Sequence, residues 1–242
     1  MNGKMKTFTI GDIHGGHKAL LQCLERSGIN KRNDRLICLG DVVDGWSGVP
    51  KCFDILLEFK NLIYVIGNHD VWFLDWLYTG YTPSIWTSQG GIATLDAYKD
   101  IDVLTKIKHQ ELLVNSLPYY VDEKNNLFVH GGFNWYKPIE EQSTRDLTWN
   151  RRLWESLCDQ DIKHIEGYTK IFIGHTPTAW LNENTLRWGQ ELNSLKPIKI
   201  GNVWNLDQGG GYEGKLTIMN VETEEYWQSD KVLTLYPNEK GR

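Results

Sequence analysis

The chain has 242 residues, 40% of them hydrophobic, which is enough to bury one large core, and we expect residues 1–242 to form a single domain. Its formal net charge of −5 argues against binding to a nucleic-acid backbone, which requires a basic surface. No apolar run reaches the roughly 20 residues that span a bilayer, and residues 1–10 lead into a strand pattern rather than a signal segment, so we expect a cytoplasmic protein without a membrane partner.

The first half of the chain alternates short apolar runs, typical of buried strands, with segments of helical pattern. In chain order the expected elements are strand 5–10, helix 18–26, strand 36–39, helix 52–60, strand 62–66 and a mainly helical stretch 89–116. Gly28 follows the first helix, Pro50 stands in the first turn of the second, and Pro118 closes the third stretch.

Strands dominate the second half. The expected ones are 127–129, 171–173, 203–206 and 216–219, with edge strands over 222–227 and 231–235. A glycine-rich turn at 209–211 separates two of these strands. Strand, helix, strand in the first half followed mostly by strands predicts a mixed α/β core.

The segments at the ends of the strands are the most informative part of the sequence. Five strands end in a glycine or a histidine next to side chains that can bind metal: Gly11-Asp12-Ile13-His14-Gly15, Gly40-Asp41-Val42-Val43-Asp44, Gly67-Asn68-His69-Asp70, His130-Gly131-Gly132 and Gly174-His175-Thr176. In an open α/β sheet, sites form outside the carboxyl ends of the strands. Each segment alone is typical of a turn, but five in the same context predict one shared site.

The side chains of these segments suit metal-assisted hydrolysis. Asp, Asn and His form a mixed oxygen and nitrogen site, without the thiolates of a structural zinc knot. Two divalent ions about 3.5–4 Å apart can hold both the attacking and the leaving oxygen of an in-line displacement. A carboxylate that bridges the ions is needed to keep two cations so close, and bound water then ionises near neutral pH.

Cysteines, tryptophans and the other histidines lie outside these segments. The four widely spaced cysteines, without a C-x-x-C pair, are expected to be buried thiols: Cys23, Cys38, Cys52 and Cys158. His17, His109 and His164 are expected to be solvated. The eleven tryptophans are expected to pack in the core, with an aromatic substrate wall as the alternative for one or two of them.

Together GDIHG, GDVVD, GNHD, HGG and GHT resemble the phosphoprotein phosphatase branch of the calcineurin-like metallophosphoesterases. The resemblance runs from Thr7 to about Thr217, and the stretch from Asn205 to Thr217 is similar to the small bacterial and phage-type Ser/Thr phosphatases. It implies a four-layer α/β/β/α sandwich, with the active site between the two sheets at the carboxyl ends of the strands.

The resemblance also implies two divalent ions, manganese first, with iron, zinc, nickel and cobalt as alternatives. One ion would be held by Asp12, His14 and the bridging Asp41, and the other by Asp41, Asn68, His130 and His175. His69 would be the general acid that protonates the leaving oxygen, with Asp44 as its orienting partner. An imidazole titrates near neutral pH and a carboxylate can aim it, which agrees with these roles.

The sequence departs from the family pattern after the second motif, where Gly45 stands in the place of an arginine that binds phosphate. We expect Trp46, the next residue, to line the pocket mouth, and Arg151 to match a second family arginine that comes after a tryptophan. A site with one arginine predicts weak binding of bare phosphate monoesters and tolerance of less charged esters, including diesters.

These observations predict a metal-dependent phosphoric ester hydrolase that acts on phosphate monoesters of proteins, such as phosphoserine and phosphothreonine, or of small molecules. The alternatives are a phosphodiesterase and a dinucleoside polyphosphate hydrolase, which would need a nucleoside pocket that no motif indicates. An inactive interaction module on the same fold is least favoured, because every ligand position is filled.

Overall fold

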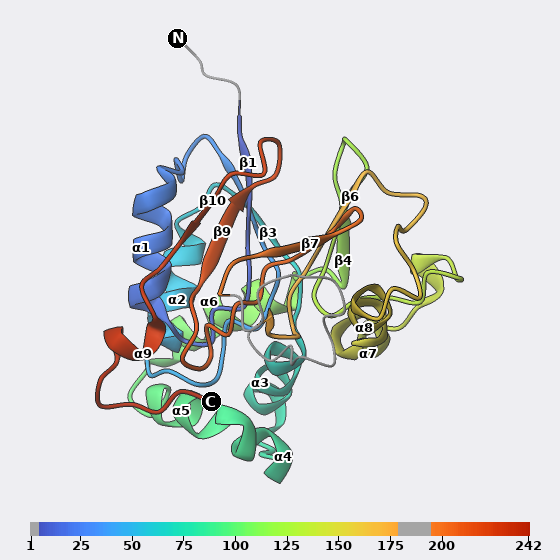
Figure 1. Ribbon diagram of the computed structural model, residues 1–242. Coiled ribbons are helices and arrows are strands. Elements are labelled where there is room, and N and C mark those ends of the chain that lie inside the picture. Colours follow the sequence, from blue (N-terminus) through green and yellow to red (C-terminus); the bar gives the residue numbers. More distant parts are fainter. Residues whose placement is uncertain (1–4, 179–194) are drawn as a thin grey trace.

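The computed structural model describes residues 5–178 and 195–242 as two sheets with helices on their outer faces (Figure 1). The first sheet has the order β10-β9-β1-β2-β3. It consists of β1 (Thr7–Ile10), β2 (Arg35–Cys38), β3 (Asn61–Tyr64), β9 (Thr217–Asn220) and β10 (Tyr226–Gln228). Strands β1, β2 and β3 are parallel, whereas β9 pairs antiparallel with both β1 and β10.

The second sheet has the order β4-β5-β6-β8-β7. Its strands are β4 (Tyr119–Val121), β5 (Asn126–Val129), β6 (Lys170–Ile173), β7 (Ile198–Ile200) and β8 (Val203–Asn205). The three central strands are parallel and both edge strands are antiparallel.

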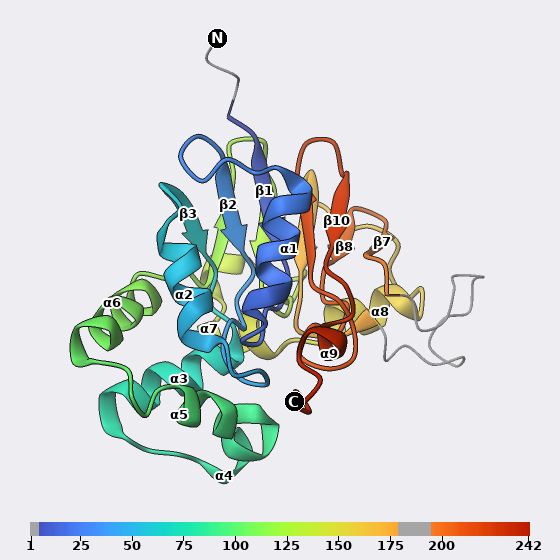
Figure 2. The same ribbon diagram turned by 90° about the vertical axis from the view of Figure 1, so that its left-hand side faces the viewer.

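Successive side chains of β2 point to opposite faces of the first sheet and enter two different apolar clusters, which shows how the layers form. Leu36 and Cys38 pack in one apolar cluster with α1 (His17–Ser27) and α2 (Val49–Leu57), while Ile37 faces a second cluster between the two sheets. That second cluster contains Ile37, Leu39, Val65, Phe128, Phe172, Leu206, Met219 and Val221. The predicted α/β/β/α arrangement is therefore confirmed, and Figure 2 shows α1 and α2 over the first sheet.

The outer face of the second sheet is covered by α7 (Thr144–Trp149) and α8 (Arg152–Cys158), whose residues Leu147, Leu153 and Trp154 pack with those of β5 and β6. The remaining helices are α3 (Asn68–Thr79), α4 (Ser84–Trp86), η1 (Thr87–Gly91), α5 (Ile92–Ala97), α6 (Val103–Val114), η2 (Ile139–Glu141) and α9 (Val232–Leu235). Within the described ranges no helix is long and apolar enough to cross a membrane.

One expectation about elements was wrong, and one long helix was not expected. Residues 231–235 were expected to be an edge strand, but they form the short helix α9, because Val232 packs in the apolar cluster with α1 and local bonds such as Thr234 N–H to the Lys231 carbonyl close the turn. No helix was expected over 68–79, where the structure has α3. In α3 the apolar residues lie on several sides of the helix, with only Phe73 of them fully buried, so they show no single stripe.

Candidate metal centre

The five predicted segments meet at the carboxyl ends of the strands, where their side chains form two groups that could each hold a metal ion. One group is Asp12, His14 and Asp41, and the other is Asp41, His130 and His175. Within each group the potential ligand atoms lie within 4.8 Å of one another, and all are buried. Because Asp41 belongs to both groups, its carboxylate lies where a bridge between two ions is needed.

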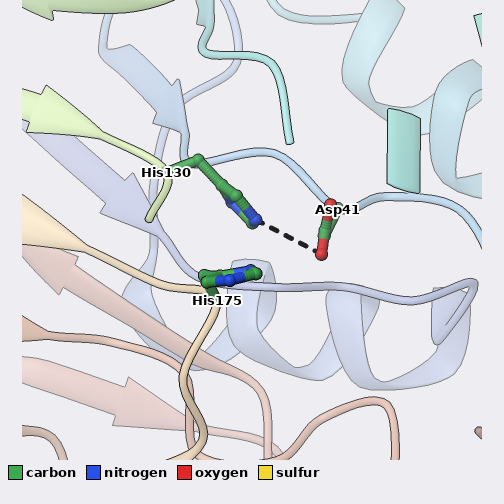
Figure 3. Close-up of side chains that lie close together, drawn as sticks. All are labelled: Asp41, His130 and His175. Carbon is green, nitrogen blue, oxygen red and sulfur yellow. Dashed lines mark ion pairs between the residues drawn. The ribbon is translucent and has the colours of Figure 1, made fainter. Parts of the chain in front are cut away.

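The second group is drawn in Figure 3, with His130 and Asp41 facing each other above His175. Nε2 of His130 lies 3.3 Å from Oδ2 of Asp41 and 3.1 Å from Oδ1 of Asn68, while Nδ1 donates to the carbonyl of Leu39 at 2.7 Å. Burial lowers the pKa of His130, but the carboxylates of Asp41 and Asp12 and the bond to the Leu39 carbonyl together raise it to about 9. The oxygens around Nε2 therefore favour a cation at this point.

The first group lies beside it. Nε2 of His14 is 3.9 Å from Oδ2 of Asp12 and 3.8 Å from Oδ2 of Asp41, and Nδ1 donates to the carbonyl of Val43 at 2.9 Å. This bond fixes the proton on Nδ1 and leaves the lone pair of Nε2 facing the carboxylates. Burial, followed by the nearby Asp207, holds the pKa of Asp12 well above its usual range.

Several observations show that these residues fit two divalent ions. Oδ2 of Asp41 and Nε2 of His175 are buried without a hydrogen-bond partner among the described residues. Four site residues, His14, Asp41, Asp44 and His175, have a positive φ between 48° and 72°, a backbone strain that clusters at functional sites. A Cβ on Gly67 or Gly174 would lie 2.1 Å from a carboxylate oxygen of Asp41 or Asp12, so both carboxylates pack directly against backbone.

Asp70 has a role in this site that was not predicted from the sequence. Its buried carboxylate accepts bonds from the backbone N–H groups of Asp41 (2.8 Å), Val42 (3.0 Å) and Gly67 (3.0 Å). It thereby ties the loop after β2 to the loop after β3 and fixes the position of Asp41. The available signal was its place as the last residue of GNHD, three residues after the glycine that precedes α3.

His69 and Asp44 form a buried pair next to the metal groups, with Nδ1 of His69 2.5 Å from Oδ2 of Asp44. Trp86 Nε1 and Thr94 Oγ1 donate to the Asp44 carboxylate at 2.8 and 2.6 Å. Burial raises the pKa of Asp44 to about 8 and lowers the pKa of His69 to about 3. Burial therefore disfavours a charge on either residue of the pair, and Nε2 of His69 is buried without a hydrogen-bond partner among the described residues.

Arg151 lies on the His175 side of the site, where Nη1 donates to the carbonyl of His175 (3.3 Å) and to Oγ1 of Thr176 (3.1 Å). Two tryptophan rings complete this side. The Trp149 ring lies 5.9 Å from the His175 ring and 5.2 Å from Trp72, whose ring is 5.0 Å from that of His69. Trp149 remains 37% exposed, so the pair presents an aromatic wall next to both histidines.

Trp46 does not line the pocket mouth as expected. It is completely buried, its Nε1 donates to the carbonyl of Gly210, and its ring stacks on Tyr236.

His109 was expected to be solvated but is buried, because it packs against Phe53 and bonds Tyr98 and Asp54. His164 is exposed as expected. The expectation for the cysteines is confirmed: all four are free and buried.

Comparison with known proteins agrees with this geometry. The profile described as calcineurin-like phosphoesterase matches residues 5–202. The chain is similar to the symmetrical bis(5'-nucleosyl)-tetraphosphatase of Nitrosomonas europaea, at 29% identity over 81% of this chain and 68% of the relative. It is also similar to serine/threonine-protein phosphatase 1 of Salmonella typhimurium, at 22% identity over 89% of this chain and 91% of that protein.

Among solved structures, a putative diadenosine tetraphosphatase superposes with a TM-score of 0.64 at 17% identity, covering 94% of each chain. This likeness concerns the fold. The chain spans between 55% and 68% of the length of the tetraphosphatases from Nitrosomonas europaea and Coxiella burnetii that it matches.

Proposed function

Because the chain belongs to the calcineurin-like phosphoesterase family, and is thus a metal-dependent phosphoric ester hydrolase, we propose that it hydrolyses phosphate monoesters at the site around Asp41. The observation that carries this proposal is the pair of ligand groups sharing Asp41 with a histidine–carboxylate pair beside them. The ions would be held by Asp12, His14 and Asp41 and by Asp41, Asn68, His130 and His175. When bound, they supply an activated water and neutralise phosphate charge. We propose manganese first.

The chain's own residues account for proton transfer to the leaving group. His69 gives the proton on Nε2 to the leaving oxygen while Nδ1 takes up the proton shared with Asp44. His69 stays neutral and Asp44 becomes a carboxylate, which the bonds from Trp86 and Thr94 stabilise. The peptide N–H of His69 donates to Oδ1 of Asp41 at 2.9 Å, so the acid is tied to the shared ligand.

A symmetrical dinucleoside tetraphosphatase is the second candidate. Two observations favour it: the similarity to several symmetrical bis(5'-nucleosyl)-tetraphosphatases, and the aromatic wall of Trp72 and Trp149, on which a nucleobase could stack.

The single-domain organisation of residues 1–242 and a cytoplasmic location stay predictions.

A substrate panel distinguishes the two candidates. With added manganese we expect hydrolysis of an aryl phosphate and a phosphoserine peptide to exceed hydrolysis of diadenosine tetraphosphate in kcat/KM. The variant Trp149→Leu sharpens this test, because loss of one stacked base costs about 1–3 kcal/mol. If the dinucleotide is the preferred substrate and Trp149→Leu raises its KM roughly 5- to 150-fold, with the phosphopeptide unaffected, the second candidate is correct.

Truncation of Arg151 tests its role in holding phosphate. Arg151→Ala is expected to cost about 2–4 kcal/mol in kcat/KM for monoesters, as for the loss of a charge-assisted donor to the transition state. The matched control is Arg145→Ala, on the exposed side of α7, which removes the same charge. Equal kinetics of the two variants on every substrate would remove Arg151 from the proposal.

A further inference from the structure

A guanidinium reaches the first metal group although no arginine follows Asp44. It belongs to Arg242, far away in the sequence, whose Nη1 lies 3.1 Å from Nε2 of His14 and whose Nη2 donates to Oε1 of Gln89 at 3.1 Å. The third donor, Nε, is buried and has no partner among the described residues. Figure 1 shows the end of the segment after α9 beside the helical stretch that includes α5, and the contacts are with η1, at Gln89 and Gly90.

The residues directly after Gly45 hold this segment in place. Trp46 stacks on Tyr236 with ring centroids 5.1 Å apart. The next residue, Ser47, donates from both its backbone N–H and its hydroxyl to the carboxylate of Glu239, each at 2.8 Å. The backbone N–H of Arg242 donates to the carbonyl of Gly211 at 2.8 Å. Arg242 is therefore fixed by specific bonds, and the stretch that lacks the family arginine provides several of them.

Gly45 faces two residues that Arg242 contacts, and Gly90 leaves room for the Arg242 side chain. A Cβ on Gly45 would lie 3.3 Å from the carbonyl oxygen of His14 and 3.5 Å from that of Gly211, and these are two residues that Arg242 bonds. Gly45 has a φ of +101°, which a side chain rarely adopts. Gly90, bonded to Gly45 through its carbonyl, has no side chain either, and a Cβ there would be 2.8 Å from Cγ of Arg242.

We propose that Arg242 binds the substrate phosphate in place of the arginine absent at position 45, opposite Arg151; this proposal rests on the proposed hydrolysis of phosphate esters. Nε2 of His14 has one lone pair, so Nη1 of Arg242 and a metal ion exclude each other there. When His14 binds an ion, Nη1 and Nε are donors without a partner, and anionic phosphate oxygens are the acceptors that match them. The site then has two guanidinium groups, which removes the reason for expecting weak binding of phosphate monoesters.

The test is binding of inorganic phosphate to the manganese-loaded protein, measured by titration calorimetry alongside KM and kcat for aryl phosphate. Arg242→Ala is expected to weaken phosphate binding and to raise KM roughly 10- to 100-fold, and Arg242→Lys to lie between it and the wild type. Lys240→Ala, two residues away and exposed, removes the same charge and is expected to change neither value. Metal content and melting temperature are expected to be unaffected in all three variants.

The proposal is overturned if Arg242→Ala binds phosphate as tightly as the Lys240→Ala control, or more tightly. It is also overturned if Arg242→Ala loses metal, because Arg242 would then belong to the metal site rather than to phosphate binding. Phosphate binding can be measured without turnover. If no substrate is hydrolysed, the proposed hydrolysis is contradicted, but the phosphate titration still tests the role of Arg242.

Discussion

Metal-free protein is expected to lose all measurable hydrolysis and to unfold at a lower temperature than the loaded protein. The ligands come from loops after β1, β2, β3, β5 and β6, in both sheets, so ions that bind only the folded chain stabilise it through linkage. At a free ion concentration 100-fold above Kd, each site adds about 2.7 kcal/mol. For a chain of this size that corresponds to a rise of roughly 5–10 °C in Tm.

Substitution of the shared ligand separates metal binding from other effects of chelation. Asp41→Asn is expected to lose both ions and all activity, whereas His175→Asn is expected to lose one, as measured by elemental analysis per chain. The control is Asp75→Asn, an exposed carboxylate on α3, which is expected to keep two ions and full turnover. Full activity in metal-free wild-type protein would contradict the two-metal proposal.

The metal groups could be predicted from the sequence because each ligand sits next to the end of its own strand. His130 directly follows an apolar run, Asp12 and Asp41 follow theirs after one glycine, and parallel strands place their carboxyl ends at one rim. Local pattern and one general rule about sheets were therefore enough to bring these residues together. The strands also alternate between two apolar clusters, which is why the layers could be predicted.

Residues that act through long-range packing could not be predicted in this way. Arg242 meets His14 across 228 positions of sequence, and nothing in its local sequence differs from a surface arginine. Asp44 likewise depends on Trp86 and Thr94, which lie in the helical segments 84–97, 42 and 50 positions away. The only available signal was negative: a glycine at position 45, where the family pattern has an arginine.

Replacement of His69 by asparagine is expected to reduce turnover roughly 10²- to 10⁴-fold, the usual contribution of general acid–base catalysis, while two ions per chain are retained. The reason for the second expectation is geometric. His69 faces Asp44 through Nδ1, and Nε2 is the atom left for substrate. Its hydrogen bond to the metal ligand Asp41 comes from the backbone N–H, which asparagine keeps, although its edge contact with the His14 ring is lost. The control is His164→Asn, because His164 is exposed and lies outside the site.

A comparison of two leaving groups tests whether the loss of turnover in His69→Asn is caused by the missing proton. An oxygen that leaves as a stable anion needs little protonation, so His69→Asn is expected to cost least on an aryl phosphate with an acidic phenol and most on a phosphoserine peptide. Asp44→Asn should follow the same order, because an amide cannot pass a proton to Nδ1 of His69 and has only one oxygen to accept the bonds from Trp86 and Thr94. A loss that is equal for both substrates, or that comes with loss of an ion, would mean that His69 positions the metal centre rather than protonating the leaving oxygen.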